Sequence, residues 1–428
     1  MASFFGDLEF RGIVKQLTDA SLGAVLDREK LTLYCGFDPT SDSLHVGSLL
    51  PLLTLRRFQL AGHRPIAVVG GATGMIGDPS GKTQERTLLD DTQLKANLVG
   101  ITATVSRFLD LKQAKVVDNA SWFKDVSYLG FLRDVGKHFT INHMVAKESV
   151  RARLEDREHG ISYTEFSYML LQAYDFHVLN QTEGCRLQIG GSDQWGNITE
   201  GIELIRRMRA VSPTKEGPDV YGLTHPLVSK ADGTKFGKTE SGTIWLDPRK
   251  TSPYQFFQFF MQTTDADVVS YLKFFTFLSH EEIKALESSI AREPEKRAAQ
   301  TALAREVTKL VHGEAEVAKA EKATQALFGT AIRELDEQTL LSVLSGAPTT
   351  KKNKDTLGAG IPLIDALVET GLCASKGAAR KEISAGGIYV NNERTSDPAA
   401  TLKADQLIAA HYILLRKGKK TYHLISFH

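Results

Sequence analysis

Short apolar runs alternate with amphipathic stretches over the first half of the chain. Four of these runs have the length and the β-branched or aromatic side chains of buried strands. They are LTLYCGF (31–37), RPIAVVGG (64–71), AKVVDN (114–119) and CRLQIGG (185–191). Between the first two, the stretch 47–62 places leucines at helical spacing and ends at Gly62, where a helix is expected to stop. A strand, a helix and a second strand form a βαβ unit, so the pattern predicts a parallel sheet with helices on its faces.

After residue 250 the pattern becomes helical, and it changes again near residue 345. The segment 345–360 is polar, basic and punctuated by Gly and Pro, which is typical of a linker. Beyond it, two short helical patterns precede three strand-like runs. We therefore expect four parts, namely an α/β domain with a helical insertion over 1–247, an α-helical domain over 248–344, a linker over 345–360 and a small α+β domain over 361–428.

Composition places the chain among ordinary soluble proteins. Its 428 residues are too many for one hydrophobic core, and 42% hydrophobic with 24% charged residues is a usual balance. The longest apolar stretches are shorter than a membrane span, and the N-terminus lacks the pattern of a secretory signal. Cys35, Cys185 and Cys373 lie far apart and form no metal-binding or disulfide motif. We expect a cytoplasmic protein without a bound metal.

Charge is spread unevenly along the chain. Residues 351–428 carry twelve Lys and Arg against seven Asp and Glu, whereas the rest of the chain carries 40 against 44. A basic tail on a mildly acidic body suggests a polyanionic partner. A solvated surface would explain the same imbalance. Charge alone does not decide between a polyanionic partner and a solvated surface.

The segment His45-Val46-Gly47-Ser48 follows the first predicted strand and opens the first predicted helix. The first backbone N–H groups of a helix are unpaired and attract phosphate. His45 and Ser48 are three residues apart and share one face of the first turn, and Gly47 leaves the backbone open to close approach. This is either a phosphate site or an ordinary capped helix.

A second basic element is SKADGTKFGKT (229–239), in which Lys235 and Lys238 alternate with Gly233 and Gly237. Two ammonium groups on a pliable loop can close over a triphosphate and follow charge to a leaving pyrophosphate. The alternative is a solvated turn.

The segment GDPSGKT (77–83) resembles the end of a phosphate-binding P-loop, but the residue five before Gly81 is Ile76 rather than Gly. The pattern therefore fails as a nucleotide-hydrolase signature. Lys82 and Arg86 remain candidates for a basic loop.

Two further segments carry polar groups in apolar surroundings. On a helix over 166–176, Tyr168, Gln172 and Asp175 form one polar stripe among leucines and Met169. A carboxylate in such surroundings needs a partner, either a small polar ligand or a network within the core. In GGSDQWGN, Asp193 follows a predicted strand, where a carboxylate can accept from ribose hydroxyls or simply belong to a turn.

Together these motifs resemble those of the bacterial tyrosyl-tRNA synthetases, a family of class I aminoacyl-tRNA synthetases. HVGS and KFGKT are similar to the HIGH and KMSKS signatures of that class. Five motifs occur in the order of the family, which are YCGFDPTSDSLHVGS, GGATGMIGDPSGK, TEFSYMLLQAYDF, IGGSDQWGN and KADGTKFGKT. The segment SKGAARKEISAGGIYVNNE (375–393) resembles the core of the S4 RNA-binding domain.

The resemblance implies a Rossmann-like catalytic domain, an α-helical anticodon-side domain and an S4-like RNA-binding domain. It implies a ligase that activates L-tyrosine with ATP to tyrosyl-adenylate and pyrophosphate, and then transfers tyrosine to the 3′ end of tRNA(Tyr) in protein biosynthesis. Both attacking groups belong to substrates, so no protein nucleophile is required and catalysis is positioning and charge stabilisation. ATP brings its own Mg²⁺, and a homodimer through the catalytic domains around 120–170 is expected.

The resemblance also implies roles for individual residues. Catalytic roles fall to Thr40, His45, Ser48, Lys82, Arg86, Lys235, Lys238 and Thr239. Tyrosine would be bound by Tyr34, Asp78, Tyr168, Gln172, Asp175 and Gln194. ATP would be bound by Gly36, Asp38, His45, Gly47, Asp193, Lys235 and Lys238. The charge of the tail, rather than the resemblance, predicts contacts to tRNA from Lys376, Arg380, Lys381, Lys417, Lys419 and Lys420.

Two positions depart from the family pattern. Ser48 stands where His or Asn is usual and cannot become cationic, and Thr239 stands in place of Ser and keeps the hydroxyl.

A tryptophanyl relative and a non-catalytic RNA-binding protein of the same fold remain alternatives. Asp175 with Tyr34 argues against the first, because an indole N–H does not need two groups placed at a phenol. The intact His45 and lysines argue against the second.

Overall fold

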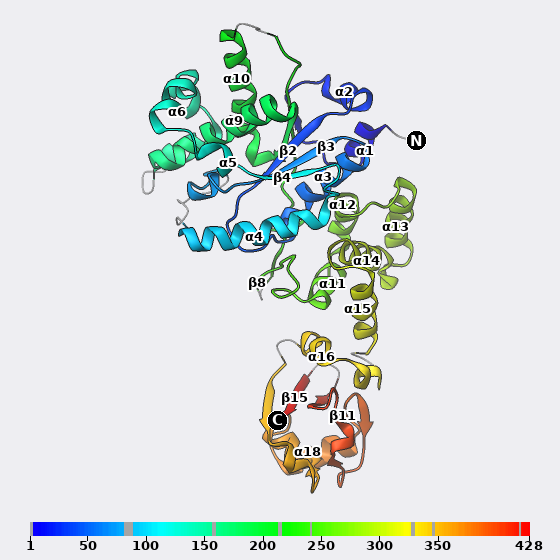
Figure 1. Ribbon diagram of the computed structural model, residues 1–428. Helices are drawn as coiled ribbons and strands as arrows, with labels where there is room; N and C mark the ends of the chain where they lie inside the picture. The colour runs from blue at the N-terminus through cyan, green and yellow to red at the C-terminus, as the bar shows by residue number, and fades with distance from the viewer. Residues whose placement is uncertain are drawn as a thin grey trace. The chain divides into compact units, whose positions relative to one another are not determined.

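The computed structural model describes residues 3–80, 89–155, 160–212, 216–239, 242–326, 330–344, 347–418 and 421–428. The chain folds as two compact units (Figure 1). The first contains residues 1–250 and 262–306, and the second contains residues 251–261 and 307–428. Each unit has its own sheet, and each is described separately.

A six-stranded sheet in the order β1-β6-β5-β2-β3-β4 forms the centre of the first unit. Its strands are β1 (Gln16–Leu17), β2 (Thr32–Phe37), β3 (Arg64–Val69), β4 (Lys115–Asp118), β5 (Cys185–Gly191) and β6 (Tyr221–His225). All neighbours are parallel except the edge pair β1 and β6. The parallel sheet predicted from the four apolar runs is confirmed, and two strands are added to it. All five residues of β6 are buried, but they show no alternation that would mark a strand in the sequence.

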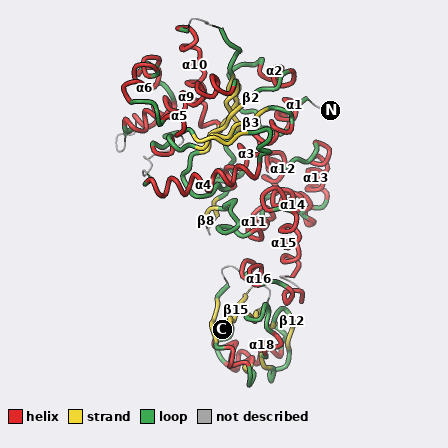
Figure 2. Tube along the Cα trace, in the orientation of Figure 1, coloured by secondary structure: helices red, strands yellow, loops and turns green. Residues whose placement is uncertain are grey.

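Helices cover both faces of this sheet. Figure 1 shows α9 and α10 on one side of β2 and β3, with α3 and α4 on the other, and Figure 2 shows the strands enclosed between them. The helices of the first unit are α1 (Phe4–Phe10), α2 (Leu22–Arg28), α3 (Leu49–Leu60), α4 (Asp91–Phe108), α5 (Ala120–Phe123), α6 (Tyr128–Asp134), α7 (Ile141–Val145), α8 (Glu148–Glu155), α9 (Tyr163–Glu183), α10 (Trp195–Val211), α12 (Asp265–Phe275) and α13 (His280–Arg292). A two-stranded ribbon, β7 (Lys238–Thr239) with β8 (Gly242–Thr243), follows the sheet.

The βαβ unit expected at the start of the chain is present as β2, α3 and β3. α3 ends at Leu60, and Gly62 follows in the left-handed region at φ +89°, as a helix stop requires. One local expectation differs from the structure. The first turn is a 3₁₀ turn over Val46–Ser48, and the α-helix begins only at Leu49. His45 is the capping residue of that turn.

A five-stranded sheet in the order β12-β11-β14-β15-β9 lies in the second unit. The strands of this unit are β9 (Thr349–Lys352), β10 (Ile361–Pro362), β11 (Ile388–Val390), β12 (Glu393–Thr395), β13 (Thr401–Leu402), β14 (Tyr412–Lys417) and β15 (Thr421–Phe427). Its helices are α11 (Pro253–Met261), α15 (Glu314–Ala326), α16 (Glu337–Val343), α17 (Leu363–Glu369) and α18 (Lys376–Ser384), while α14 (Ala298–His312) belongs in part to each unit. The strand-like and helical patterns expected after residue 361 are all present.

The five-stranded sheet is buried on both faces. Along β14, Ile413 and Leu415 pack into a core with α17 and α18. Tyr412 and Leu414, which alternate with them, pack into a second core with α15 and α16. The alternation follows from the two-residue period of a strand. The helices before residue 345 and the sheet after it therefore form one continuous body.

The segment expected to be a linker takes part in this body, which corrects the expectation for 345–360. Thr349–Lys352 form β9, which pairs in parallel with β15 at the sheet edge. Leu357 is buried in the core that contains α17 and α18. The polar composition was misleading because an edge strand is held by backbone hydrogen bonds and tolerates Lys and Thr side chains.

Candidate active site

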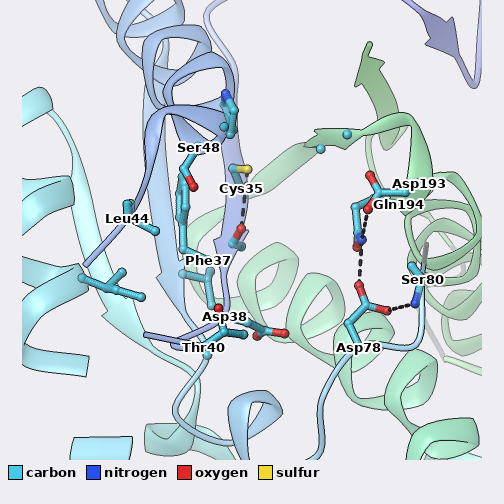
Figure 3. A pocket seen from close by; sticks show the side chains of 18 of the residues that line it. Cys35, Phe37, Asp38, Thr40, Leu44, Ser48, Asp78, Ser80, Asp193 and Gln194 are labelled. Carbon is cyan, nitrogen blue, oxygen red and sulfur yellow. Dashed lines mark hydrogen bonds between the residues drawn. The ribbon is translucent and has the colours of Figure 1, made fainter. Parts of the chain in front are cut away.

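A cavity of about 620 Å³ lies at the carboxyl ends of the parallel strands of the first unit. β2 pairs with β3 on one side and with β5 on the other, so the chain order reverses at β2. Ligands of such sheets bind at this reversal. Figure 3 shows Asp78, Asp193 and Gln194 on one side of the cavity and Cys35, Phe37, Thr40 and Ser48 on the other.

The cavity brings together most of the residues proposed from the sequence. Its lining includes Tyr34, Gly36, Asp38, Thr40, His45, Gly47, Ser48, Asp78, Tyr168, Gln172, Asp175, Asp193, Gln194 and Lys235. Lys238 is exposed and does not line it. Lys82 and Arg86 fall outside the described residues, as does the side chain of Thr239.

The segment 45–48, the first signature, has a defined geometry at its capping residue. The backbone N–H of Gly47 donates to His45 Nδ1 over 3.0 Å. Because Nδ1 accepts, the neutral ring carries its proton on Nε2, which can then donate to a ligand. A Cβ on Gly47 would lie 2.6 Å from His45 Cε1. Any side chain at this position would therefore clash with the imidazole ring in its present position.

The segment 229–239, the lysine loop, adjoins the first signature. Val46 N–H donates to Ile244 O over 3.0 Å, and Leu246 N–H donates to Leu44 O over 2.9 Å. These two backbone bonds join the chain just after the lysine loop to the first signature. Lys235 reaches the cavity from this loop.

Asp175 is a buried carboxyl at the cavity wall, and it is held by two donors. Trp122 Nε1 donates to Oδ1 over 2.9 Å, and Asn119 Nδ2 donates to Oδ2 over 3.1 Å. Burial nevertheless raises the pKa of Asp175 to about 8, although both hydrogen bonds act in the opposite direction. Tyr34, also in the lining, has a buried hydroxyl that finds no hydrogen-bond partner among the described residues. Burial, with the Asp175 charge, raises its pKa and keeps it protonated.

A chain of hydrogen bonds connects Asp175 to the other end of the polar stripe on α9. Asn119 Nδ2 also donates to Thr73 Oγ1 over 3.0 Å, and Thr73 donates to Asp38 Oδ1 over 2.9 Å. Tyr168 donates to Asp38 Oδ2 over 2.8 Å. The polar groups of the stripe could be satisfied by a ligand or by a network within the core. For Tyr168 and Asp175, the hydrogen bonds of this chain supply such a network.

A second polar group surrounds Asp78. Gln194 Nε2 donates to Asp78 Oδ2 over 2.7 Å, and the Ser80 N–H donates to Oδ1 over 2.9 Å, as drawn in Figure 3. Gln172 Nε2 donates to Gln194 Oε1 over 3.3 Å, and Asn197 Nδ2 donates to the same oxygen over 3.1 Å. These bonds tie α9 to the start of α10 and fix the side chains around one part of the cavity.

Asp193 lies in the turn that follows β5. Burial raises its pKa. A Cβ on Gly191 would lie 2.4 Å from Asp193 Oδ1, so this glycine makes room for the carboxylate. A Cβ on Gly36 would meet no atom of the described residues within 4 Å, so the backbone of β2 leaves room for a ligand there.

Several residues of the site are not among those proposed from the sequence. Each of them bonds to a residue that was proposed, and they are Thr73, Asn119, Trp122 and Asn197. Asn119 is fully buried and follows β4, the third of the predicted strands. Its place after a parallel strand is a signal that could have identified it, because side chains at that edge converge on the cavity.

The basic residues proposed for the tail lie in the second unit. Lys376, Arg380 and Lys381 are exposed on α18. Lys376 pairs with Asp365 over 2.6 Å, and Lys417 pairs with Glu382 over 3.2 Å. Lys419 and Lys420 fall outside the described residues.

Among the described residues no group of three or more His, Cys, Asp or Glu side chains is placed to hold a metal ion. None of the described helices is long and apolar enough to cross a membrane.

Residues 26–329 match the family model of class I tRNA synthetases (W and Y). The chain belongs to this family of class I aminoacyl-tRNA synthetases. Residues 340–425 match a second model, described as a tyrosine–tRNA ligase SYY-like C-terminal domain. The resemblance seen in the sequence motifs is thereby confirmed.

Similar proteins support the same grouping. The tyrosine–tRNA ligase of Roseiflexus castenholzii is 53% identical over 430 residues, covering 99% of both chains. That of Geobacillus stearothermophilus is 54% identical over 426 residues, covering 98% of this chain and 99% of its own. A truncated mitochondrial tyrosyl-tRNA synthetase of Aspergillus nidulans superposes with a TM-score of 0.68 at 32% identity, covering 77% of this chain and 95% of its own. The Giardia lamblia tryptophanyl-tRNA synthetase shares the fold, with a TM-score of 0.55 at 14% identity over 79% of this chain and 88% of its own.

Proposed function

We propose that this synthetase ligates L-tyrosine to tRNA(Tyr). In the first step a carboxylate oxygen of tyrosine attacks the α-phosphorus of ATP. A new oxygen–phosphorus bond forms, and the bond between the α-phosphorus and the oxygen of the leaving pyrophosphate breaks. In the second step the terminal ribose hydroxyl of the tRNA attacks the carbonyl carbon and AMP leaves. The observation that carries the proposal is the Tyr34 and Asp175 pair in the cavity wall, because one unpartnered hydroxyl and one carboxyl suit a phenol.

Tyrosine would be recognised at its two ends. Tyr34 and Asp175 would bond to the phenolic hydroxyl, so the pocket favours tyrosine over phenylalanine or tryptophan. Asp78, Tyr168 and Gln172, with Gln194 near the carboxylate, would bind the charged backbone end. The hydrogen bonds between Gln194 and Asp78 and between Tyr168 and Asp38 pre-arrange these groups, which lowers the cost of ordering them on binding.

ATP, with its Mg²⁺, would occupy the part of the cavity nearer the first signature. His45 Nε2 and Thr40 would donate to the phosphates, and Gly36 and Gly47 would allow close approach of the nucleotide. Asp193 would accept from the ribose. Ser48 would contribute at most a hydroxyl. Asp38 would act chiefly through Tyr168, to which it is bonded.

Charge stabilisation of the leaving pyrophosphate would come from Lys235 and Lys238, with the Thr239 hydroxyl. Such groups lower the barrier most when they are already fixed near the developing charge. Lys82 and Arg86 would add positive charge at the same stage. No protein group is asked to act as a nucleophile.

The tRNA would contact the second unit. Lys376, Arg380 and Lys381 give α18 an exposed basic face, and Lys417, Lys419 and Lys420 add further positive charge. Phosphate oxygens would compete with Asp365 and Glu382 for the two paired lysines. We propose a cytoplasmic setting, where tRNA and ATP are available.

A homodimer through the first unit accounts for an unusual concentration of exposed apolar side chains. Among the described residues these include Tyr128, Leu129, Leu132, Ile141, Leu154 and Tyr163. The Tyr128 and Tyr163 hydroxyls lie 3.2 Å apart. Exposed apolar patches of this kind mark protein interfaces. Leu129→Asp should dissociate the dimer, as sedimentation velocity would show, and a wild-type protein that sediments as a monomer would contradict this assignment.

Pyrophosphate exchange tests the activity. Labelled pyrophosphate should enter ATP when tyrosine is added, and neither tryptophan nor phenylalanine at equal concentration should support it. Charging of tRNA(Tyr) should follow in a second assay. Exchange driven by tryptophan would favour the tryptophanyl alternative, and binding of tRNA without any exchange would favour a non-catalytic RNA-binding protein.

A further inference from the structure

The lysine loop is attached to α12 by two kinds of contact. The Ala231 N–H donates to Asp267 Oδ1 over 2.7 Å. The Phe236 ring is buried and packs against the rings of Tyr271 and Phe275, with centroids 4.9 and 5.2 Å away. Both contacts flank Lys235, one on each side along the chain. The position of this lysine is therefore set by α12 rather than by the loop alone.

Asp267 is well placed for such a role. It is 7% exposed and lies in the first turn of α12, and its other oxygen accepts from Thr264 Oγ1 over 2.7 Å. A carboxylate that accepts from a backbone N–H makes a stronger hydrogen bond than a neutral group. Tyr271 adds a third contact, because its hydroxyl donates to Ser229 O over 3.2 Å.

The other end of α12 is also fixed, by two buried arginines. Arg11 donates to Thr276 O over 3.0 Å and to Leu278 O over 2.7 Å. Arg57 donates to Thr276 O as well, and both guanidinium groups reach Lys273 O. They satisfy carbonyls that α12 leaves unpaired at its carboxyl end, and that of Leu278 just beyond it.

Arg57 belongs to α3, the helix that begins directly after the first signature. A continuous set of contacts thus runs from that signature along α3, through Arg57 to α12, and through Asp267 and Phe236 to the lysine loop. The two ATP-binding elements of the proposed function share one rigid support. Pre-organised charges stabilise a transition state without reorganising during the reaction.

We propose that Asp267 and Phe236 are positioning residues that hold Lys235 at the cavity for adenylate formation. This rests on the proposed role of Lys235 toward ATP. Neither residue belongs to the lining of the cavity. Their loss should weaken the use of ATP and leave the binding of tyrosine unchanged. The residues proposed to bind tyrosine lie in β2, in α9, at Asp78 and at Gln194, and none of them belongs to α12 or the lysine loop.

The test compares Asp267→Ala with Asp265→Ala. Both aspartates lie in the first turn of α12, so both variants lose the same charge near the helix N-terminus. Asp265 accepts from Gln300 Nε2 over 2.6 Å, and among the described residues no hydrogen bond joins it to the lysine loop. Asp267→Asn is the conservative variant, since its amide oxygen can still accept from Ala231 N–H.

In tyrosine-dependent pyrophosphate exchange, Asp267→Ala should lower kcat/KM for ATP about tenfold, the value of one charged hydrogen bond. Its Kd for tyrosine, measured by equilibrium dialysis, should stay within about twofold of wild type. Asp265→Ala should resemble wild type, and Asp267→Asn should lose less than Asp267→Ala because it keeps a neutral acceptor for the Ala231 N–H. Tryptic cleavage after Lys230, Lys235 or Lys238 should be faster in Asp267→Ala only, at unchanged Tm.

Phe236→Leu, which keeps an apolar side chain but not the ring contacts, should change ATP use in the same direction as Asp267→Ala. The proposal is overturned if Asp267→Ala uses ATP as well as Asp265→Ala does, or if it loses affinity for tyrosine to the same extent. The variant Lys235→Ala distinguishes failure of the positioning role of Asp267 and Phe236 from failure of the proposed role of Lys235 toward ATP. If Lys235→Ala also exchanges normally, the assigned function of Lys235 fails; if only Lys235→Ala is impaired, the support by α12 fails.

Discussion

Gly237 lies directly against Val46, the residue that follows His45 in the first signature. A Cβ on Gly237 would be 2.6 Å from Val46 Cγ2, and the backbone of Gly237 has φ +81°. Only glycine satisfies both conditions without strain. The lysine loop and the first signature therefore touch through a residue that has no side chain.

Gly237→Ala should slow adenylate formation by about tenfold or more, since the loop must shift to relieve the contact. Gly233→Ala is the matched control. Gly233 has the same φ of +81°, but its Cβ would meet no atom within 4 Å in the part of the chain that the structure describes. Rapid-quench measurement of tyrosyl-adenylate would compare the two, and equal rates would mean that contact with Val46 has no effect on the reaction.

Tyr34→Phe should reduce discrimination against phenylalanine, by about tenfold for one buried hydrogen bond. The variant keeps the ring, which packs 5.4 Å from the ring of Phe176, so the pocket should retain its shape. Exchange with each amino acid gives the ratio of specificity constants. An unchanged ratio would show that the phenol is recognised elsewhere.

Lys238→Ala should slow adenylate formation while the Kd for tyrosine stays close to wild type, because its charge is needed as pyrophosphate leaves. Lys238 is exposed outside the cavity lining, so its effect requires the loop to move toward ATP. The single-turnover rate constant measures this. A rate constant equal to that of wild type would make Lys238 a solvated residue.

The raised pKa of Asp175 predicts a dependence of stability on pH. A carboxyl with a pKa of about 8 in the folded protein costs stability once the pH exceeds its unfolded value near 4, and the cost grows up to about pH 8. Asp175→Asn carries no charge there. The Tm of Asp175→Asn minus the Tm of wild type should therefore increase between pH 5 and pH 8. A difference in Tm that stays constant over this range would place the pKa of Asp175 near its ordinary value.

Arg380→Ala with Lys381→Ala should weaken tRNA binding and leave tyrosine-dependent exchange unchanged. Each lost phosphate contact should make the dependence of log Kd on log salt concentration shallower by about one. Lys354→Ala, which removes an exposed charge elsewhere in the second unit, is the control. Filter binding at several salt concentrations measures both, and identical slopes for the two variants would remove α18 from the tRNA interface.

Sequence patterns predicted the features that depend on short-range regularity. The buried strands of the large sheet and the stripe of Tyr168, Gln172 and Asp175 follow from two-residue and helical periods. Asn119 and Trp122 could not be found in this way, because their importance depends on contacts with Asp175, more than 50 residues away. Edge strand β9 was not predicted, because it pairs with β15 through backbone hydrogen bonds. Such pairing does not require the apolar side chains by which a strand is recognised in a sequence.

The two apolar cores on either side of the C-terminal sheet limit how this protein could be recombined with a relative. An exchange of tails at residue 345 would separate Leu340 and Leu344 from Tyr412, Leu414 and Leu424, which share one core. Each chimera would then combine half of one interface with half of another. A crossover before Glu314 would transfer α15, α16 and the sheet together and would leave behind only Tyr254 of α11 from the residues of that core, so the boundary that keeps the core together lies more than thirty residues before the change in composition.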